Sequence, residues 1–358
     1  MATHTKPSNR GSEGEPAPGP LVSVVVLGES RRPFFEEAIA SVLSQDLPRP
    51  QFELLVVKGF REPALDDYLS HIGAISIFAP GTSVAVKIAL AVEKARGPVL
   101  ALLDDDDVFE PNKLRAIVDA FHEHPGLGYF RNGQKVIGAD GRPIPTSALR
   151  GPSSPAWRRV RALLIEPGAK ERGLERISVQ RPDFNDSSLA IRRDLAEVAV
   201  PYLRQLGGRA DTLLFFVSAC ADCSILLDPR PLTRYRVHEE NLSLASGMSA
   251  EIRIQRLVDY ARAIQRDYRI VREFVEKNGS PRALRLIDGR IAISRLILAC
   301  RSIETTRGEF GRLFLAVLRF SDTYPVREDR PGVVASLVFL LSPNFGRAMY
   351  FHLLRARV

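Results

Sequence analysis

The chain has 358 residues, enough to bury a full hydrophobic core in one large domain or two smaller ones. Its 45% hydrophobic and 26% charged residues are ordinary for a soluble globular protein. The formal net charge of +8 and the pI near 9.6 indicate an anionic partner. Because few aromatic residues are interleaved with the basic ones, nucleic acid is a weaker choice than a nucleotide or a membrane surface.

Cysteine usage and the N-terminus indicate the compartment. Three cysteines cannot form a framework of paired disulfides, which favours a reducing cytosol. Cys220 and Cys223 form a C-x-x-C in a stretch that predicts a helix. No second Cys or His pair stands at zinc-finger spacing, so packing is favoured over a zinc or redox role. The N-terminus lacks an apolar signal region, and no apolar run reaches the roughly 18 residues of a membrane span. We therefore expect a cytoplasmic protein.

The first hundred or so residues alternate between predicted strands and helices. A Pro-, Gly- and Ser-rich tail over residues 1–20 is predicted to be disordered. Strands are then predicted over 21–27, 52–57, 74–78 and 97–103, with helices over 33–43 and 81–92. This βαβ pattern predicts the α/β class with a mainly parallel sheet. Neither a P-loop nor a Rossmann glycine motif is present, so a nucleotide would be held by carboxylates, a metal and strand-end loops.

The second half of the chain is less regular. Short β-like pieces over 127–130 and 134–137 precede an irregular basic stretch over 148–181, a strand over 185–191 and a helix that holds Asp211. From residue 248 the pattern is helical and basic. We expect a catalytic domain over 21–247 and a helical appendage over 248–358. The basic face of the appendage would touch anionic lipid on the cytoplasmic membrane face or a lipid-linked acceptor, although such faces are more often only solvated. Its arginines are Arg253, Arg256, Arg262, Arg266 and Arg269.

Four consecutive carboxylates, Asp104, Asp105, Asp106 and Asp107, end the strand predicted over 97–103. Clustered negative charges repel one another unless a proton, water or a cation compensates them. The carboxyl end of a buried strand is where open α/β sheets place their ligand crevice, and a divalent metal suits that position. The alternative is a solvated acidic turn at the N-terminus of the next helix.

Several blocks of this sequence resemble the GT-A glycosyltransferases of the family 2 type. Residues 23–26, 38–45, 52–57 and 102–107 look like the opening blocks of that family, and Tyr-Arg-Val-His-Glu-Glu-Asn-Leu-Ser over 235–243 looks like the block that closes its catalytic domain. The resemblance implies a nucleotide-sugar-binding α/β domain with a D-x-D motif and Mn²⁺ or Mg²⁺. It also implies inverting transfer of a sugar from a nucleotide-diphosphate donor to a glycan, lipid-linked or protein acceptor.

The resemblance assigns roles to the acidic run. Asp104, with Asp105, would contact the nucleotide, and Asp106 would bind the metal that bridges the diphosphate. Asp107 is the alternative metal ligand, because a run of four leaves the register of the motif open. His238 resembles the family histidine that completes the metal site, although a lone loop histidine is often structural.

The same comparison suggests the base and the phosphate contacts. An inverting transferase needs a group that deprotonates the acceptor hydroxyl. Asp211 matches the second member of the acidic pair that the family places at a helix start, and it is our predicted base. A plain helix N-terminal carboxylate is the alternative. Arg234 and Arg236 are predicted diphosphate contacts, since a guanidinium fork suits phosphate.

This sequence departs from the family at two strand ends. Lys58 follows the second strand where the family has a carboxylate that reads the nucleobase, and Glu29 lies in an altered turn after the first strand. We predict that Glu29 or Lys58 substitutes, Lys58 by contacting phosphate. The missing carboxylate leaves the donor open and motivates a second hypothesis, a non-catalytic nucleotide-sugar- or glycan-binding relative. A third, nucleotidyl transfer, would release pyrophosphate.

Overall fold

The computed structural model describes residues 19–29, 34–144, 161–178, 180–238, 250–301, 305–320, 338–340, 342 and 345–346. Several predicted segments lie wholly or partly outside these residues. They are the tail up to residue 18, the basic stretch over 148–160, the end of the closing block over 239–243, and most of the chain after residue 320.

Among the described residues, nine strands form one sheet in the order β3-β2-β1-β4-β8-β6-β9-β5, with β7 paired to β9. The strands are β1 Val22–Gly28, β2 Phe52–Lys58, β3 Ile75–Phe78, β4 Val99–Asp104, β5 Val108–Phe109, β6 Leu127–Ile137, β7 Leu163–Ile165, β8 Leu189–Arg192 and β9 Ser224–Arg236. Strands β1 to β4 are mutually parallel. Because β8 is antiparallel to both β4 and β6, and β6 is parallel to β9, six strands point their carboxyl ends to one edge. The predicted α/β fold with a mainly parallel sheet is confirmed.

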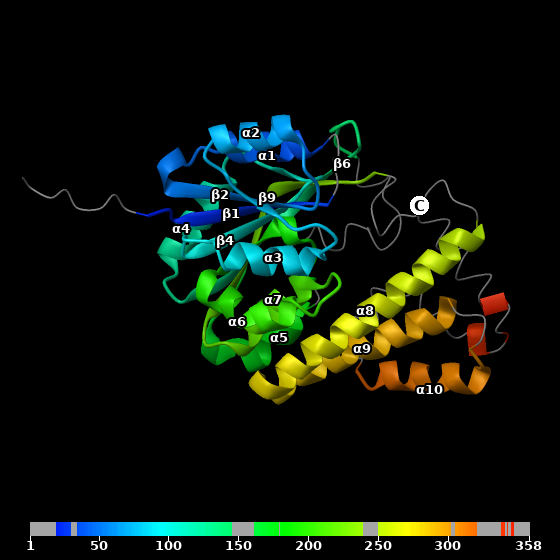
Figure 1. Cartoon of the computed structure of the whole chain (residues 1–358). Helices are drawn as coiled ribbons and strands as arrows, with labels where there is room; N and C mark the ends of the chain where they lie inside the picture. The colour runs from blue at the N-terminus through cyan, green and yellow to red at the C-terminus, as the bar shows by residue number, and fades with distance from the viewer. Residues whose placement is uncertain are drawn as a thin grey trace, which may run out of the picture.

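Helices cover both faces of this sheet (Figure 1). The continuous apolar run of β1 explains why, since Val24 and Val26 pack on one face while Val25 and Leu27 pack on the other. On the first face lie α1 Phe35–Leu43, α2 Pro63–His71 and α4 Lys113–Glu123. On the second lie α3 Val84–Val92, α5 Lys170–Ser178, α6 Arg193–Leu203 and α7 Ala210–Cys220.

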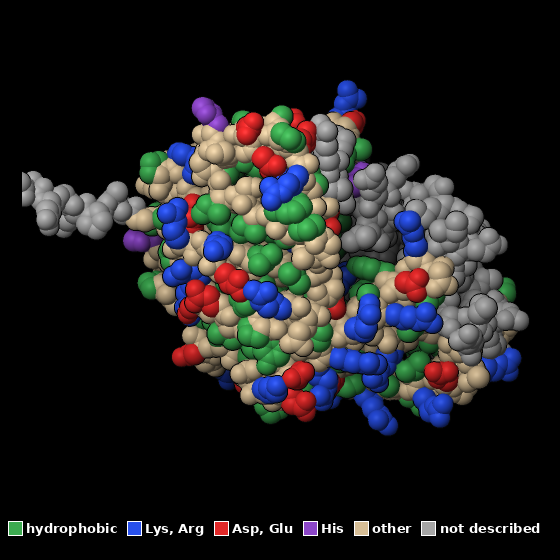
Figure 2. Space-filling model, in the orientation of Figure 1, with side chains coloured by type: hydrophobic (Ala, Val, Ile, Leu, Met, Phe, Trp, Pro, Cys, Tyr) green, Lys and Arg blue, Asp and Glu red, His purple; other side chains and the backbone are tan. Residues whose placement is uncertain are grey.

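Within the described part of the chain, three later helices follow: α8 Ala250–Asn278, α9 Pro281–Arg301 and α10 Arg307–Leu318. Val271 and Phe274 of α8 and Ile287 of α9 are buried in the same core as α7, so the first two helices pack against the layer of helices on the second face of the sheet. Lys and Arg side chains gather over α8 and α9 (Figure 2). Within the described helices, none is long and apolar enough to cross a membrane.

Three predictions of local structure need correction. The pieces predicted over 127–130 and 134–137 form one strand, because extra residues on β9 take up the register shifts on both sides of Gly133 and β6 stays paired. A Cβ there would lie 2.7 Å from the carbonyl oxygen of Pro229, so only glycine fits. The strand predicted over 185–191 begins at Leu189, after a 3₁₀ turn. Helix α7 ends at Cys220 and excludes Cys223.

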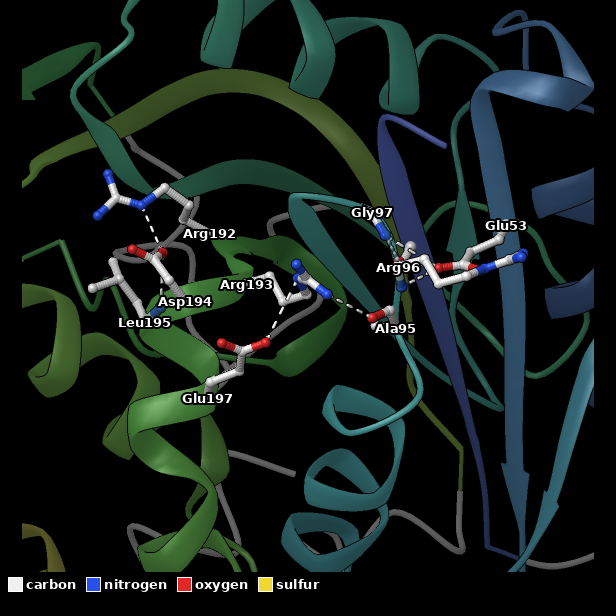
Figure 3. Close-up of polar contacts among 10 residues, drawn as sticks. Glu53, Ala95, Arg96, Gly97, Arg192, Arg193, Asp194, Leu195 and Glu197 are labelled. Carbon is white, nitrogen blue, oxygen red and sulfur yellow. Dashed lines mark hydrogen bonds and ion pairs between the residues drawn. The ribbon is translucent and has the colours of Figure 1, made fainter. Parts of the chain in front are cut away.

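Glu53 joins three segments at the amino edge of the sheet (Figure 3). Its carboxylate on β2 accepts hydrogen bonds from the Ser23 hydroxyl of β1 at 2.6 Å, from the Arg96 backbone N–H at 2.6 Å and from the Gly97 N–H at 3.2 Å. The Arg96 side chain adds a bond of 2.7 Å. Burial raises the pKa of Glu53, but these donors outweigh it and lower the pKa overall. The buried charge therefore aligns β1, β2 and the start of β4.

Replacing Glu53 with Gln should lower the free energy of unfolding by about 1–3 kcal/mol, because buried donors lose a charged acceptor. Since the folded-state pKa is lowered, the ionised group stabilises the protein above its ordinary pKa, and this contribution is lost as the pH falls through the lowered value. Urea denaturation measures the effect. The control, Arg96→Ala, removes only one bond from a side chain that is 68% exposed and should cost less. Equal losses in the two variants would contradict this role.

Candidate active site

The acidic run lies at the carboxyl edge of the sheet, where β4 ends. Asp104 is the last residue of β4 and pairs in register with Leu27, and Gly28 pairs with Lys58. Asp104, Asp106 and Asp107 each present one ligand oxygen, and these oxygens lie within 4.8 Å of one another. The parallel arrangement therefore brings the ends of β1, β2 and β4 to one place, as expected for this class of sheet.

Residues distant in the sequence hold this turn in shape. Asp107 accepts a hydrogen bond from the Arg236 backbone N–H at 2.8 Å and another from the Asn185 side-chain amide at 2.8 Å. Nε2 of His238 lies 3.0 Å from Oδ2 of Asp106. The structure thus brings Asp106, Asp107 and His238 together at the end of β9.

The surrounding residues offset only part of the electrostatic repulsion among the carboxylates of the acidic run. Burial raises the pKa of Asp104 well above its usual range, and repulsion from Asp186 and from the other members of the run adds to this. Burial and the neighbouring Asp106 raise the pKa of Asp107 to about 7. One oxygen of Asp186 is buried and has no hydrogen-bond partner among the described residues. A set of hard oxygen ligands in which burial and mutual repulsion raise the pKa values of Asp104 and Asp107 fits Mg²⁺ or Mn²⁺.

The side chain of Arg236 is 1% exposed and is engaged within the protein. Its Nε donates to the backbone oxygen of Asp106 at 2.8 Å, and its terminal nitrogens reach Glu37 at 2.5 Å and the Gly138 oxygen at 3.3 Å. The guanidinium also lies over the Phe34 ring, 4.4 Å from its centroid. These contacts fix the backbone of the acidic turn. Contact of Arg236 with a diphosphate stays a prediction.

The other predicted phosphate contact, Arg234, is paired with Glu110 of the segment that follows β5. Two nitrogens of Arg234 lie 3.1 and 3.2 Å from the Glu110 oxygens, and Lys135 reaches the same carboxylate at 2.9 Å. The Arg234 side chain is 39% exposed, so part of it faces solvent. Its role toward a donor also stays a prediction.

At the two altered strand ends, each predicted residue has a partner of opposite charge. The Glu29 carboxylate accepts a hydrogen bond from the Lys87 ammonium of α3 at 2.9 Å. The Glu29 backbone N–H donates to the Asp105 carboxylate at 2.9 Å. The Lys58 ammonium, which is buried, lies 2.6 Å from Asp66 of α2. The link from Glu29 to Asp105 connects the turn after β1 with the acidic run. Contact of Glu29 or Lys58 with a nucleotide remains untested.

Asp211 is the second residue of α7, and it is buried. Its Oδ1 accepts the Thr212 backbone N–H at 2.7 Å. Burial raises the pKa of Asp211 to about 6, an effect that Arg209 opposes and Asp183 reinforces. Repulsion from Asp211 raises the pKa of Asp186, which in turn raises that of Asp104, in both cases after burial as the larger cause. The predicted base and the acidic run therefore belong to one electrostatically connected region.

Sequence reasoning did not identify Asp183 and Asp186. The available signal was two carboxylates within four residues, one just before the strand predicted over 185–191 and one at its start. The backbone decides their position. It has a positive φ at Arg181 and Asn185, and it turns the segment that holds the two carboxylates back toward the acidic run.

Comparison with known proteins identifies the domain. The family model for glycosyl transferase family 2 matches residues 22–197. This part of the chain is a family 2 glycosyltransferase domain. The matched range contains the acidic run but ends before Asp211 and His238, whose assignments depend on the geometry described above. The glycosyltransferase assignment predicted from the sequence is confirmed.

Individual relatives agree with this assignment. The putative teichuronic acid biosynthesis glycosyltransferase TuaG of Bacillus subtilis is 27% identical over 131 residues, which are 35% of this chain and 51% of that protein. The match thus spans about half of that relative. Two crystal structures of TarS from S. aureus, each 14% identical, superpose with TM-scores of 0.56 and 0.53. They cover 92% and 93% of this chain and 89% and 53% of their own chains, and at this identity they show a shared fold alone.

Adding Mn²⁺ should raise the midpoint of thermal unfolding, because the cation binds the folded carboxylate cluster and not the unfolded chain. At ~100 times Kd the stabilisation is about 2.7 kcal/mol. Without cation, a raised carboxyl pKa stabilises the folded state at low pH, and that contribution is lost as the pH rises through about 7 for Asp107. Because protons and cation compete, the Mn²⁺ shift should be larger at about pH 8 than at about pH 5.5.

The matched variants for this measurement are Asp106→Asn and Asp119→Asn. Asp119 is an exposed carboxylate on α4, outside the cluster, so its variant should keep the full Mn²⁺ shift. Asp106→Asn should abolish most of it. An equal Mn²⁺ shift in both variants would show that the cation binds elsewhere.

Proposed function

We propose that the protein is an inverting, metal-dependent glycosyltransferase that moves a sugar from a nucleotide-diphosphate donor to an acceptor hydroxyl. The observation that carries the proposal is the carboxylate cluster of Asp104, Asp106 and Asp107, with His238 beside it, at the carboxyl edge of a family 2 domain. Ligands of open α/β sheets bind at that edge.

In this proposal, Asp106, Asp107 and His238 hold Mn²⁺ or Mg²⁺, and Asp104 and Asp105 face the nucleotide. When bound, the cation stabilises the negative charge that grows on the departing nucleoside diphosphate. Arg236 keeps the turn in position through its bond to the Asp106 backbone. Asp105 ties the turn to the loop after β1.

Asp211 acts as the base that removes the proton of the acceptor hydroxyl. A pKa of about 6 leaves this carboxylate mostly ionised at neutral pH while making it a stronger base than an exposed aspartate. Its electrostatic connection to Asp104 through Asp186 supports a position beside the donor site.

We further propose a glycan, lipid-linked or protein acceptor at the cytoplasmic membrane face. The name of the relative TuaG, which refers to teichuronic acid biosynthesis, favours a polysaccharide product. Exposed arginines on α8 support peripheral contact with anionic lipid. The four whose side chains are described are Arg256, Arg262, Arg266 and Arg269.

One observation favours a second function, a nucleotide-sugar- or glycan-binding protein without catalysis. Lys58 stands where the family places a nucleobase-reading carboxylate, and its ammonium is paired with Asp66 at 2.6 Å. A donor bound without base recognition would be held through its phosphates and sugar alone. Tight binding with no turnover for any donor would identify this function.

Screening nucleotide sugars with Mn²⁺ for release of nucleoside diphosphate tests the proposal. Asp211→Asn should lower kcat by about 100-fold or more without changing nucleotide affinity, since it removes only the base. Asp106→Asn should weaken Mn²⁺-dependent nucleotide binding as well as turnover. Asp119→Asn, on the exposed face of α4, is the control. Wild-type turnover in Asp211→Asn would exclude Asp211 as the base, and release of pyrophosphate would indicate nucleotidyl transfer.

The pH dependence of kcat/KM, measured at saturating Mn²⁺, reports the base directly. Because the base works only when deprotonated, the rate should rise with pH through a midpoint of about 6. This rise, the acid limb of the pH–rate profile, should be missing from the profile of the residual activity of Asp211→Asn. A limb that persists in the variant would assign the titration to another group.

A further inference from the structure

The later helices reach the segment that surrounds Asp211. Arg290 of α9 donates to both oxygens of Asp183, to Oδ1 at 3.0 Å and to Oδ2 through a second, shorter bond. The side chains are 12% and 11% exposed, so the pair is shielded from water. A guanidinium that grips both carboxylate oxygens fixes the orientation of the carboxylate as well as its charge. Asp183 is therefore held from α9.

Asp183 is linked in turn to the predicted base. Its Oδ2 accepts the Thr212 hydroxyl at 2.9 Å, and the Thr212 backbone N–H donates to Asp211 at 2.7 Å. A continuous series of hydrogen bonds thus runs from Arg290 through Asp183 and Thr212 to Asp211. A displacement of Asp183 would be transmitted to the first turn of α7, where Asp211 lies.

Helix α8 holds the same region from the other side. The buried carboxylate of Asp267 accepts the backbone N–H groups of Gly207 and Gly208 at 2.9 Å each and that of Arg209 at 3.1 Å. These three N–H groups precede α7 directly, so a carboxylate here also complements the helix dipole. Helix α8 therefore contacts the segment just before the predicted base, and α9 contacts Asp183, which is bonded to the residue just after the base.

We propose that Arg290 is a positioning residue for the reaction, which holds Asp183 and through it Asp211, and that α8 and α9 form one wall of the active site. The proposal rests on the proposed function. It adds a role for a part of the chain that the family match over residues 22–197 does not include.

The charges around Asp211 agree with this role. Burial raises the pKa of Asp183, but Arg290, together with Arg181 and the Thr212 hydroxyl, outweighs burial and lowers that pKa to about 2, so Asp183 stays ionised. Arg290 also lowers the pKa of Asp211, against burial and the charge of Asp183. Removing one buried cation from this pair of carboxyls should raise the proton affinity of the pair. The other charged or titratable groups that face the pair are Arg209, Asp186, Arg181, Tyr129 and Arg131 of β6, and Tyr268 of α8.

Arg290→Gln tests the proposal against a matched control, Arg272→Gln. Arg272 joins α8 to Asp288 of α9 at 2.7 Å, so its loss disturbs the same helix pair without touching Asp183. We expect Arg290→Gln to lower kcat on the order of 10- to 100-fold with little change in the donor KM, because the base is misplaced while the donor site is intact. The acid limb of kcat/KM should move to higher pH. Arg272→Gln should keep both the wild-type kcat and the wild-type limb.

The variant Arg290→Lys distinguishes the effect of the positive charge from that of the two-oxygen contact. It also provides a second test in case Arg290→Gln does not fold. Lysine keeps the positive charge but not the two-oxygen grip, so we expect a wild-type acid limb with a reduced kcat. Wild-type kcat in both the Gln and the Lys variants would overturn the positioning role.

A measurement without substrate distinguishes failure of this inference from failure of the proposed function. Titration of ¹³C-labelled aspartate carboxyls by NMR in the free protein should show the Asp183 and Asp211 transitions at higher pH in Arg290→Gln than in wild type or Arg272→Gln. Identical curves in all three proteins would refute the coupling, whether or not the enzyme turns over. Shifted curves with no turnover for any donor would instead reject the proposed function alone.

Discussion

Mutual repulsion among the carboxylates at the end of β4, of which Asp107 is buried and Asp104 and Asp106 are partly buried, sets the electrostatics of this site. Asp104, Asp106 and Asp107 present oxygens within 4.8 Å of one another, and burial strengthens their mutual repulsion. The surrounding protein relieves only part of it, through the donors from Arg236 and Asn185 to Asp107. A site that needs further positive charge, in a crevice at the sheet edge, is suited to a cation and the diphosphate that the cation would bind.

Glu53 shows what the same kind of group does when its partners are complete. It is buried, as Asp107 is, yet its pKa is lowered, because the hydroxyl of Ser23, two backbone N–H groups and the Arg96 side chain all donate to it. The two edges of the sheet therefore use buried carboxylates in opposite ways. At the amino edge several donors compensate the charge, which stabilises the fold, whereas at the carboxyl edge burial and mutual repulsion raise the pKa values of Asp104 and Asp107 where ligands bind.

The base region extends this contrast beyond the sheet. Asp183 is held ionised by Arg290, whereas Asp186 and Asp211 have raised pKa values in the same neighbourhood. Carboxyls whose environments push their pKa values apart are suited to different tasks, one as a fixed charge and one as a base. The helices that follow the family domain supply one of the charges that set this difference.

Features that depend on local pattern could be predicted without the structure: the parallel sheet, the acidic run at the end of β4, the family, and Asp211 at a helix start. Only the tertiary structure showed that Lys58 pairs with Asp66, that Lys87 pairs with Glu29, and that α9 reaches Asp183. Arg290 and Asp183 are separated by 107 residues, and no periodicity or motif links them. A hydrophobic pattern specifies which face of an element is buried, but the ion pair that forms is decided by how those faces pack.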